Sequence, residues 1–168
     1  MNQSGKYGES LWKSFLETKG YDVEDAPNYK FYDWDLRATK READQDTNFQ
    51  PVYTFEVKYD EKAYWWANKR GTPDNPNLYI EYRNTNRNED SGILMSKADF
   101  YVYIIKAQTD IAYLFNTDKL RTHLTSASYK SVGNSATGDD NAMGWIPSLA
   151  VLMQTNSFIK QIELYALT

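Results

Sequence analysis

The segment from Val52 to Tyr59 constrains the fold more than any other part of the chain, because its side chains alternate in character along its length. In an extended strand, alternate side chains point to opposite faces of the sheet. One face of this segment is apolar and carries Phe55, Val57 and Tyr59, and the other is polar and carries Thr54, Glu56, Lys58 and Asp60. The pattern predicts a strand that buries one face and presents a charged row on the other.

The remaining periodic segments predict an α/β protein. Apolar residues at helical spacing predict a helix over Tyr7 to Lys19, which ends at Gly20. Alternation predicts strands over 31–37, 78–83, 100–105 and 111–115, a turn with a short helix over 91–98, and a helix capped by Asn116 or Thr117. Residues 61–77 and 125–141 are predicted to be loops. We therefore expect one domain over residues 1–168, with a central mixed sheet flanked by helices.

Composition excludes several classes of site. With one histidine and no cysteine, the chain lacks the residues for disulfides and for zinc sites built from His and Cys. The N-terminal residues do not resemble a signal peptide, and no apolar run is long enough to span a bilayer, so we expect a cytoplasmic protein without membrane contact. A net charge of −4 argues against a protein that coats nucleic acid by bulk charge, although a local basic patch or bound metal would still allow DNA binding.

Glu56 and Lys58 are suited to phosphodiester hydrolysis. Two residues apart on a strand, they share a face, and between them Val57 points into the core. A carboxylate can hold Mg²⁺, a lysine can orient or deprotonate water, and the Val57 backbone carbonyl is a further candidate ligand. Asp33 or Asp35, on the preceding predicted strand, would complete the metal site if the two strands pair.

The Glu-x-Lys triplet is weak evidence alone. The same chain contains Glu17-Thr18-Lys19 on the predicted helix and Asp60-Glu61-Lys62 at the end of the strand. Residues two apart on a helix point to different sides, which excludes the first. The alternative for Glu56 and Lys58 is an ordinary surface strand whose charges pair across the sheet.

The whole pattern resembles the PD-(D/E)XK nuclease superfamily, particularly its small phage-type and Holliday-junction-resolvase-like members. The resemblance extends from Gly8 to Ile105 and depends on five short motifs: Gly8-Glu9, Tyr32-Asp33-Trp34-Asp35-Leu36, Phe55-Glu56-Val57-Lys58-Tyr59-Asp60, Asn77 to Tyr82, and Ser91-Gly92-Ile93 leading to Lys97-Ala98-Asp99-Phe100-Tyr101. It implies a restriction-endonuclease-like core with the order helix, three strands, short helix, strand. The chain departs from the family in having no proline before the aspartate.

The resemblance implies a Mg²⁺-dependent DNA endonuclease, with Mn²⁺ as a substitute metal. Glu56 and an upstream aspartate would hold the metal, Lys58 would act on the attacking water, and Glu9 would join the site from the first helix. Asp33 is the preferred aspartate because alternating apolar residues follow it, and Asp35 remains the alternative. The phage-type resemblance implies an intracellular enzyme, and the cell in which it acts could be a phage-infected host.

Other functions and partners remain open from the sequence. One motif per chain predicts a homodimer if both DNA strands are cut. The substrate could be RNA instead of DNA, and the chain could be a non-catalytic DNA-binding or assembly protein on a nuclease-like scaffold. Two adjacent aromatic residues and two basic ones are the best candidates for nucleic-acid contact: Trp65, Trp66, Lys69 and Arg70.

Overall fold

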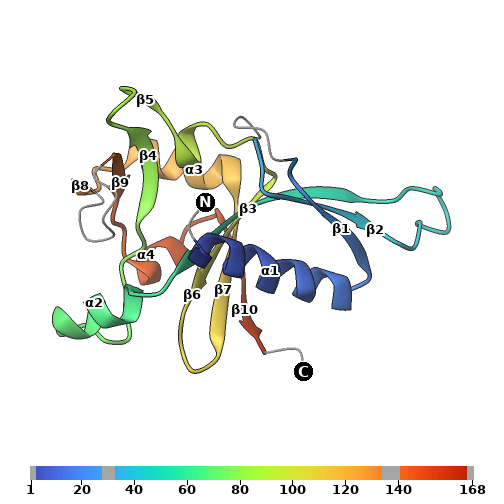
Figure 1. The fold of residues 1–168 in the computed structure, drawn as a ribbon, viewed down its shortest axis with the longest axis horizontal. Coiled ribbons are helices and arrows are strands. Elements are labelled where there is room, and N and C mark those ends of the chain that lie inside the picture. Colours follow the sequence, from blue (N-terminus) through green and yellow to red (C-terminus); the bar gives the residue numbers. More distant parts are fainter. Residues whose placement is uncertain (1–2, 28–32, 134–140, 166–168) are drawn as a thin grey trace. The chain divides into compact units, whose positions relative to one another are not determined.

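The computed structural model describes residues 3–27, 33–133 and 141–165. This part of the chain is α/β, with four α-helices, a mixed six-stranded sheet and an antiparallel four-stranded sheet (Figure 1). The chain divides into two compact units, each described here by itself. The first comprises residues 1–61, 98–114 and 160–168, and the second comprises residues 62–97 and 115–159.

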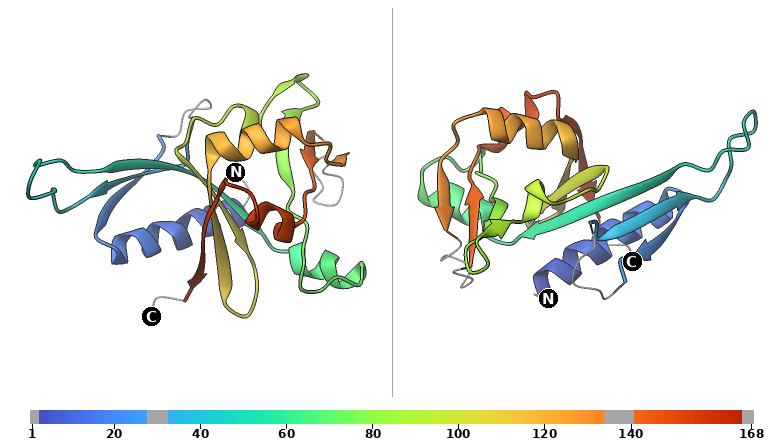
Figure 2. Two further views of the ribbon diagram at one scale, coloured as in Figure 1. Left: turned by 180° about the vertical axis from the view of Figure 1, so that it is seen from behind. Right: turned by 90° about the horizontal axis from the view of Figure 1, so that it is seen from above.

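The first unit is built around the six-stranded sheet. Its helix is α1 (Gln3–Thr18), and the strand order across the sheet is β1-β2-β3-β6-β7-β10. The strands are β1 (Tyr21–Asp25), β2 (Leu36–Lys40), β3 (Val52–Asp60), β6 (Phe100–Ile105), β7 (Asp110–Asn116) and β10 (Phe158–Leu164). β1, β2 and β3 pair in an antiparallel manner, whereas β3 and β6 are parallel, so the sheet is mixed as the sequence predicts. Figure 2 shows β2 and β3 as a long twisted hairpin.

Helix α1 confirms the helix predicted over Tyr7 to Lys19, although it begins a few residues earlier, at Gln3. Its apolar stripe packs on the sheet through Trp12 and Leu16, both buried, and Gly20 adopts a left-handed backbone conformation (φ 87°) just after the helix ends. The buried core between this helix and the sheet consists of Trp12, Leu16, Leu36, Ala38, Phe55, Val57, Val102, Ile104, Ala112 and Leu164. The apolar face of β3 therefore packs against α1.

The predicted strand over 31–37 is wrong in its placement. β2 begins at Leu36, and Asp33, Trp34 and Asp35 precede it, while residues 31 and 32 lie outside the described residues. Alternation of apolar and acidic residues suggested an earlier start, but the ladder with β3 is made by the segment from Leu36, opposite Phe55, to Thr39, opposite Val52. Strand β1, which pairs with β2, was not predicted because its Tyr-Asp-Val-Glu-Asp sequence is short and largely charged.

The second unit contains the four-stranded sheet, in the order β5-β4-β9-β8. Its elements are α2 (Ala63–Lys69), β4 (Ile80–Asn84), β5 (Glu89–Asp90), the 3₁₀ helix η1 (Gly92–Leu94), α3 (Thr117–Ser126), β8 (Ser131–Gly133), β9 (Ala142–Trp145) and α4 (Leu149–Met153). The strand predicted over 78–83 is present as β4, but it belongs to this sheet and not to the sheet of β2 and β3. The three strands that precede β6 in the first sheet are β1, β2 and β3.

Two predicted loops contain regular structure. Residues 61–77 include α2, because Ala63 to Lys69 has no helix breaker until Gly71, which adopts φ 77° just beyond the helix. Residues 125–141 include β8, and 134–140 lie outside the described residues.

Other predictions are confirmed. The segment 91–98 contains η1, the strands over 100–105 and 111–115 are β6 and β7, and the Asn116 side chain caps α3 by accepting the Lys119 N–H at 3.0 Å. No helix within the described residues has the length and apolar character needed to cross a membrane.

Candidate active site

Glu56 and Lys58 lie side by side on the polar face of β3, as the alternation predicts. Lys58 Nζ is 3.2 Å from Glu56 Oε1, and the side chains are 37% and 14% exposed, respectively. Val57, between them, is buried in the core under α1. The strand therefore holds a carboxylate and an ammonium group together at an accessible surface while Val57 anchors its backbone.

Asp35 contacts the backbone of this motif directly. Its carboxylate Oδ2 accepts the N–H of Val57 at 2.8 Å, and its own N–H donates to the Phe55 carbonyl at 2.8 Å. Leu36 pairs with Phe55, so extending the antiparallel register by one residue sets Asp35 opposite Glu56. At the end of the β2–β3 ladder, the Asp35 carboxylate thus accepts the Val57 N–H, which within a ladder would donate to a backbone carbonyl of the neighbouring strand.

Asp33 lies two residues before Asp35 and outside β2. Its expected place on the face of Glu56 depended on a strand over 31–37, and the ladder begins only at Leu36. The hydrogen bond to the Glu56-Val57-Lys58 segment is made by Asp35. The geometry therefore favours Asp35 over Asp33 as the aspartate that accompanies Glu56.

Glu9 belongs to the same electrostatic group. It lies on α1, is only 8% exposed, and is 3.8 Å from the Lys6 ammonium. Burial raises the pKa of its carboxyl, and the nearby negative charge of Asp35 raises that pKa further, against the opposing influence of Lys6 and Lys58. The first helix thus contributes a carboxyl group whose pKa is influenced by both Asp35 and Lys58.

Two tyrosines of β6 line the same row and were not singled out from the sequence. Tyr101 is paired with Glu56 and Tyr103 with Lys58 in the parallel register, and both tyrosines are buried. Tyr103 Oη donates to Asp60 Oδ2 at 2.7 Å, which fixes the end of the polar row. The signal available in the sequence is the spacing of Tyr101 and Tyr103, two apart on a predicted strand.

The residues fit a hard divalent cation held by few protein ligands. Among the described residues, no three Asp, Glu or His side chains are grouped closely enough to form a metal cluster by themselves. Mg²⁺, however, is usually bound through one or two carboxylates while it keeps several waters. Asp35 and Glu56, opposite each other at a partly exposed edge, meet that requirement, and Glu9 adds negative charge. Val57 reaches Asp35 through its N–H, and its carbonyl remains a candidate ligand.

The four residues expected to contact nucleic acid lie in the second unit. Trp65, Trp66 and Lys69 belong to α2, and Arg70 follows its last residue. Both tryptophans are exposed, at 51% and 41%.

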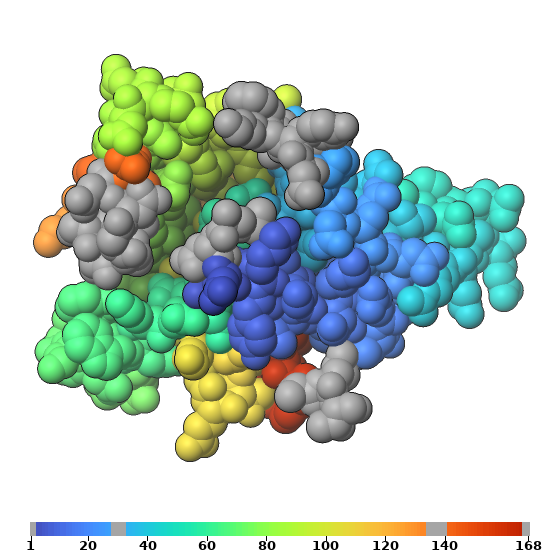
Figure 3. All heavy atoms as spheres, viewed as in Figure 1, coloured from blue at the N-terminus to red at the C-terminus, as the bar shows by residue number. Residues whose placement is uncertain are grey.

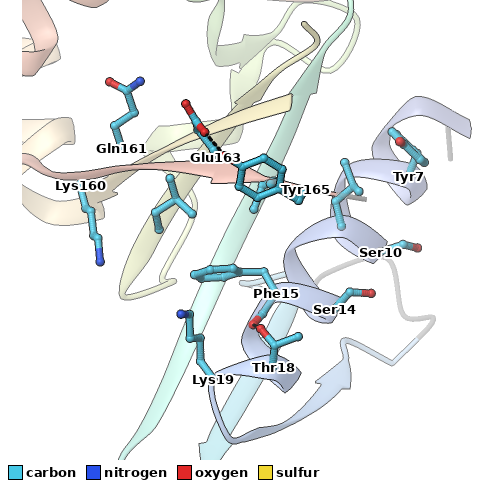
Figure 4. A pocket seen from close by; sticks show the side chains of 13 residues that line it. Tyr7, Ser10, Ser14, Phe15, Thr18, Lys19, Lys160, Gln161, Glu163 and Tyr165 are labelled. Atoms are coloured by element: carbon cyan, nitrogen blue, oxygen red, sulfur yellow. Dashed lines mark hydrogen bonds between the residues drawn. The ribbon is translucent and has the colours of Figure 1, made fainter. Parts of the chain in front are cut away.

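A cavity of about 630 Å³ lies in the first unit between α1 and β10 (Figure 4). Its apolar lining includes Leu11, Phe15, Ile162 and Leu164, with Lys19 and Lys160 at one side. Glu9, Asp35, Glu56 and Lys58 do not line this cavity, so it is separate from the polar row of β3.

Comparison of the chain with known protein families, with curated proteins and with solved structures finds no match.

Proposed function

We propose that the chain is a Mg²⁺-dependent DNA endonuclease of the PD-(D/E)XK type. Asp35, Glu56 and Lys58 form its centre, and Glu9 supports them. The observation that carries the proposal is the 2.8 Å hydrogen bond from the Val57 N–H to Asp35, which joins an acidic residue to the Glu-x-Lys strand. An ordinary surface strand with paired charges does not require an upstream carboxylate bound to its backbone.

The order of elements supports the proposal. A helix and three antiparallel strands are followed by α2, by the strands β4 and β5 of the second sheet and by η1, and then by β6, which is parallel to β3. Apart from the insertion of β4 and β5, this order agrees with the helix, three strands, short helix, strand core that the resemblance implies. The third strand of that core is β3, which carries the motif, and not the segment over 78–83.

The proposed metal ligands are Asp35 and Glu56, with the Val57 carbonyl as a third. When bound, Mg²⁺ or Mn²⁺ neutralises charge on the phosphate and makes a bound water more acidic. Asp35 is the ligand that we propose in place of Asp33.

Lys58 and Glu9 complete the chemistry. Lys58, 3.2 Å from Glu56 and partly exposed, is placed to hold the attacking water and to offset the negative charge of the scissile phosphate. Glu9, with its raised pKa, binds a proton more readily than an ordinary glutamate and is suited to receive one from that water. The substrate would be DNA in the cytoplasm, and cutting both strands would require a homodimer.

A cleavage assay tests the proposal. Supercoiled, linear, branched and single-stranded DNA, together with an RNA strand, are incubated with Mg²⁺ and the wild type, Lys58→Ala, or Lys160→Ala. Lys160 is an exposed lysine on β10 and serves as the matched control. We expect Lys58→Ala to lose at least about 100-fold in rate, and Lys160→Ala to match the wild type. Equal cleavage by all three proteins would remove Lys58 from the mechanism.

A second function is favoured by one observation. Because no three acidic or histidine side chains are grouped for metal binding in the described ranges, a non-catalytic DNA-binding or assembly protein on the same scaffold is the competing proposal. Calorimetric titration with Mn²⁺ separates the two. Binding that is lost in Asp35→Asn supports the nuclease, and absence of binding to the wild type supports the competing function.

A further inference from the structure

Helix α2 presents two indoles to solvent. Ala63 and Ala67 are buried and occupy one side of the helix, whereas Trp65 and Trp66 are 51% and 41% exposed. The two rings meet edge to face, with their centroids 4.6 Å apart. Figure 3 shows the atoms of this segment, in green, uncovered on the visible face. Large aromatic side chains are normally buried, and two adjacent exposed ones form a patch of the kind that marks a binding surface.

The basic residues near these indoles lie within a segment that acidic residues flank, because Glu61 precedes Lys62 and Asp74 follows Pro73. Lys69 Nζ lies 5.2 Å from the centre of the Trp65 ring, and Arg70 follows directly. From Lys62 to Pro73 the sequence contains three basic residues and no Asp or Glu, although the whole chain carries a net charge of −4. A short basic segment in an acidic protein is complementary to a polyanion.

We propose that α2 binds unpaired nucleotides of a DNA strand, with Trp65 and Trp66 stacking on bases and Lys62, Lys69 and Arg70 meeting phosphates. Aromatic faces and cations side by side are the combination with which proteins hold single strands. Bases in an intact duplex already stack on each other and leave no face for an indole. The exposed patch therefore selects DNA that contains a single-stranded segment, such as an end, a flap or a junction.

This inference rests on the proposed function only for the choice of DNA as the nucleic acid. For the proposed endonuclease, it names DNA with a single-stranded segment as the substrate class. A membrane surface could also attract tryptophan and lysine together. The helix is only seven residues long and buries both of its alanines, so it offers two indoles and no continuous apolar face to a bilayer. Unpaired nucleotides fit the isolated indoles and their neighbouring cations better.

The test measures binding in EDTA, where metal-dependent cleavage does not occur. Fluorescently labelled single-stranded dT20, the same length of duplex DNA, a single-stranded rU20 and anionic phosphatidylserine vesicles are titrated with each protein. The variants are the double substitution Trp65→Ala with Trp66→Ala, the conservative double substitution to Phe, and Phe49→Ala. Phe49, 62% exposed in the connection between β2 and β3, is the matched control for loss of an exposed aromatic ring.

We expect wild type and Phe49→Ala to bind dT20 equally and more tightly than duplex. The double alanine variant should lose roughly tenfold in affinity for each stacked indole, and the phenylalanine variant should recover part of that loss. Tryptophan fluorescence of the wild type should be quenched by dT20. An equal affinity for rU20 supports the same stacking chemistry with RNA as a second source of unpaired bases.

Three results would overturn the proposal: equal binding of dT20 and duplex by the wild type, unchanged dT20 binding by the double alanine variant, or binding to vesicles in place of DNA. Circular dichroism shows whether each variant is folded, and the phenylalanine variant preserves the test if the alanine variant is not. Because no cleavage is measured, failure here leaves the proposed nuclease function intact. Conversely, a Lys58→Ala protein that cleaves normally but binds dT20 would refute only the catalytic proposal.

Discussion

The carboxylate of Asp35 holds the backbone N–H of Val57 at 2.8 Å, and this bond joins two chain segments at the centre of the candidate active site. Val57 itself is buried beneath α1, so the bond connects a core residue of β3 to the residue that precedes β2. Glu56 and Lys58, on either side of Val57, are thereby fixed in position relative to the Asp35 carboxylate. A metal ion or phosphate near Glu56 would meet Asp35 without rearrangement of the backbone.

Asp35→Asn should abolish metal-dependent cleavage with little effect on folding. The amide oxygen of asparagine can still accept the Val57 N–H, but the negative charge that would bind the cation is lost. We expect at least about a 100-fold decrease in cleavage rate. Rates on a branched DNA substrate and thermal unfolding curves measure the two effects separately.

Asp33→Asn is the matched control for that substitution. Asp33 is half-buried, two residues away and outside β2, and the variant should cleave within about twofold of the wild type. The reverse outcome, an inactive Asp33→Asn and an active Asp35→Asn protein, would return the metal site to Asp33.

Local patterns were sufficient to predict β3, and they were insufficient for the segment that faces it. The alternation from Val52 to Tyr59 gives the correct faces for Glu56, Val57 and Lys58 because Phe55 and Val57, on one side of this strand, are buried in the core. Near Asp33 and Asp35 the same alternation continues beyond the point where pairing begins. The start of β2 is decided by its partner strand, through the register of Leu36 with Phe55, and sequence periodicity contains no information about that register.

Long-range pairing also explains the other differences. Strand β4 was predicted as a strand but joins β9, which lies some sixty residues later in the chain, in the second sheet. Helix α2 was not predicted, because the helix breakers Gly71 and Pro73 follow it closely and the whole segment resembles a loop. Glu9 and Asp35 are brought together by packing of α1 on the sheet, so their interaction could be expected only from the resemblance.

Glu9→Gln should stabilise the protein at neutral and higher pH. Burial and the charge of Asp35 raise the pKa of Glu9, so the folded protein holds this proton more tightly than the unfolded chain does. Its contribution to stability is therefore largest below the ordinary glutamate pKa and is lost as the pH rises through the raised pKa. Glutamine removes that loss, because it carries no charge to bury.

The measurement is the melting temperature of wild type and Glu9→Gln at about pH 4 and about pH 8. We expect the variant to melt higher than the wild type at pH 8, with the difference shrinking toward pH 4. Cleavage should fall in the same variant if Glu9 supports the chemistry. A variant that melts lower than the wild type at pH 8 would mean that the ion pair with Lys6 outweighs burial.

Adding Mn²⁺ should raise the melting temperature of the wild type. A ligand that binds only the folded state stabilises it by about 2.7 kcal/mol at a concentration 100 times its Kd. Differential scanning fluorimetry in EDTA and in excess Mn²⁺ measures the shift. Glu56→Gln should lose most of the shift, whereas Glu61→Gln, an exposed acidic residue just beyond β3, should retain it. An equal shift in both variants would indicate that the metal binds elsewhere.

Gly8 determines how closely α1 approaches the strand that carries the motif. A Cβ at this position would lie 2.7 Å from Tyr59 Cβ, whereas a Cβ at Gly5, on the same helix, would meet no atom within 4 Å. Alanine at Gly5 should stabilise the helix by about 0.5–1 kcal/mol, because it restricts the unfolded backbone. Alanine at Gly8 gains the same propensity but must push α1 away from β3, at a cost of about 1–3 kcal/mol.

We therefore expect Gly5→Ala to be more stable than the wild type and Gly8→Ala to be less stable, as measured by urea unfolding. Gly8 and Glu9 are consecutive, and Tyr59 follows Lys58, so displacement of the helix also moves Glu9 relative to Lys58. Cleavage by folded Gly8→Ala should fall at temperatures well below its melting point, while cleavage by Gly5→Ala should not change. A Gly8→Ala protein as stable and as active as Gly5→Ala would show that α1 can shift on the sheet without cost, and that its spacing from β3 is not what positions Glu9.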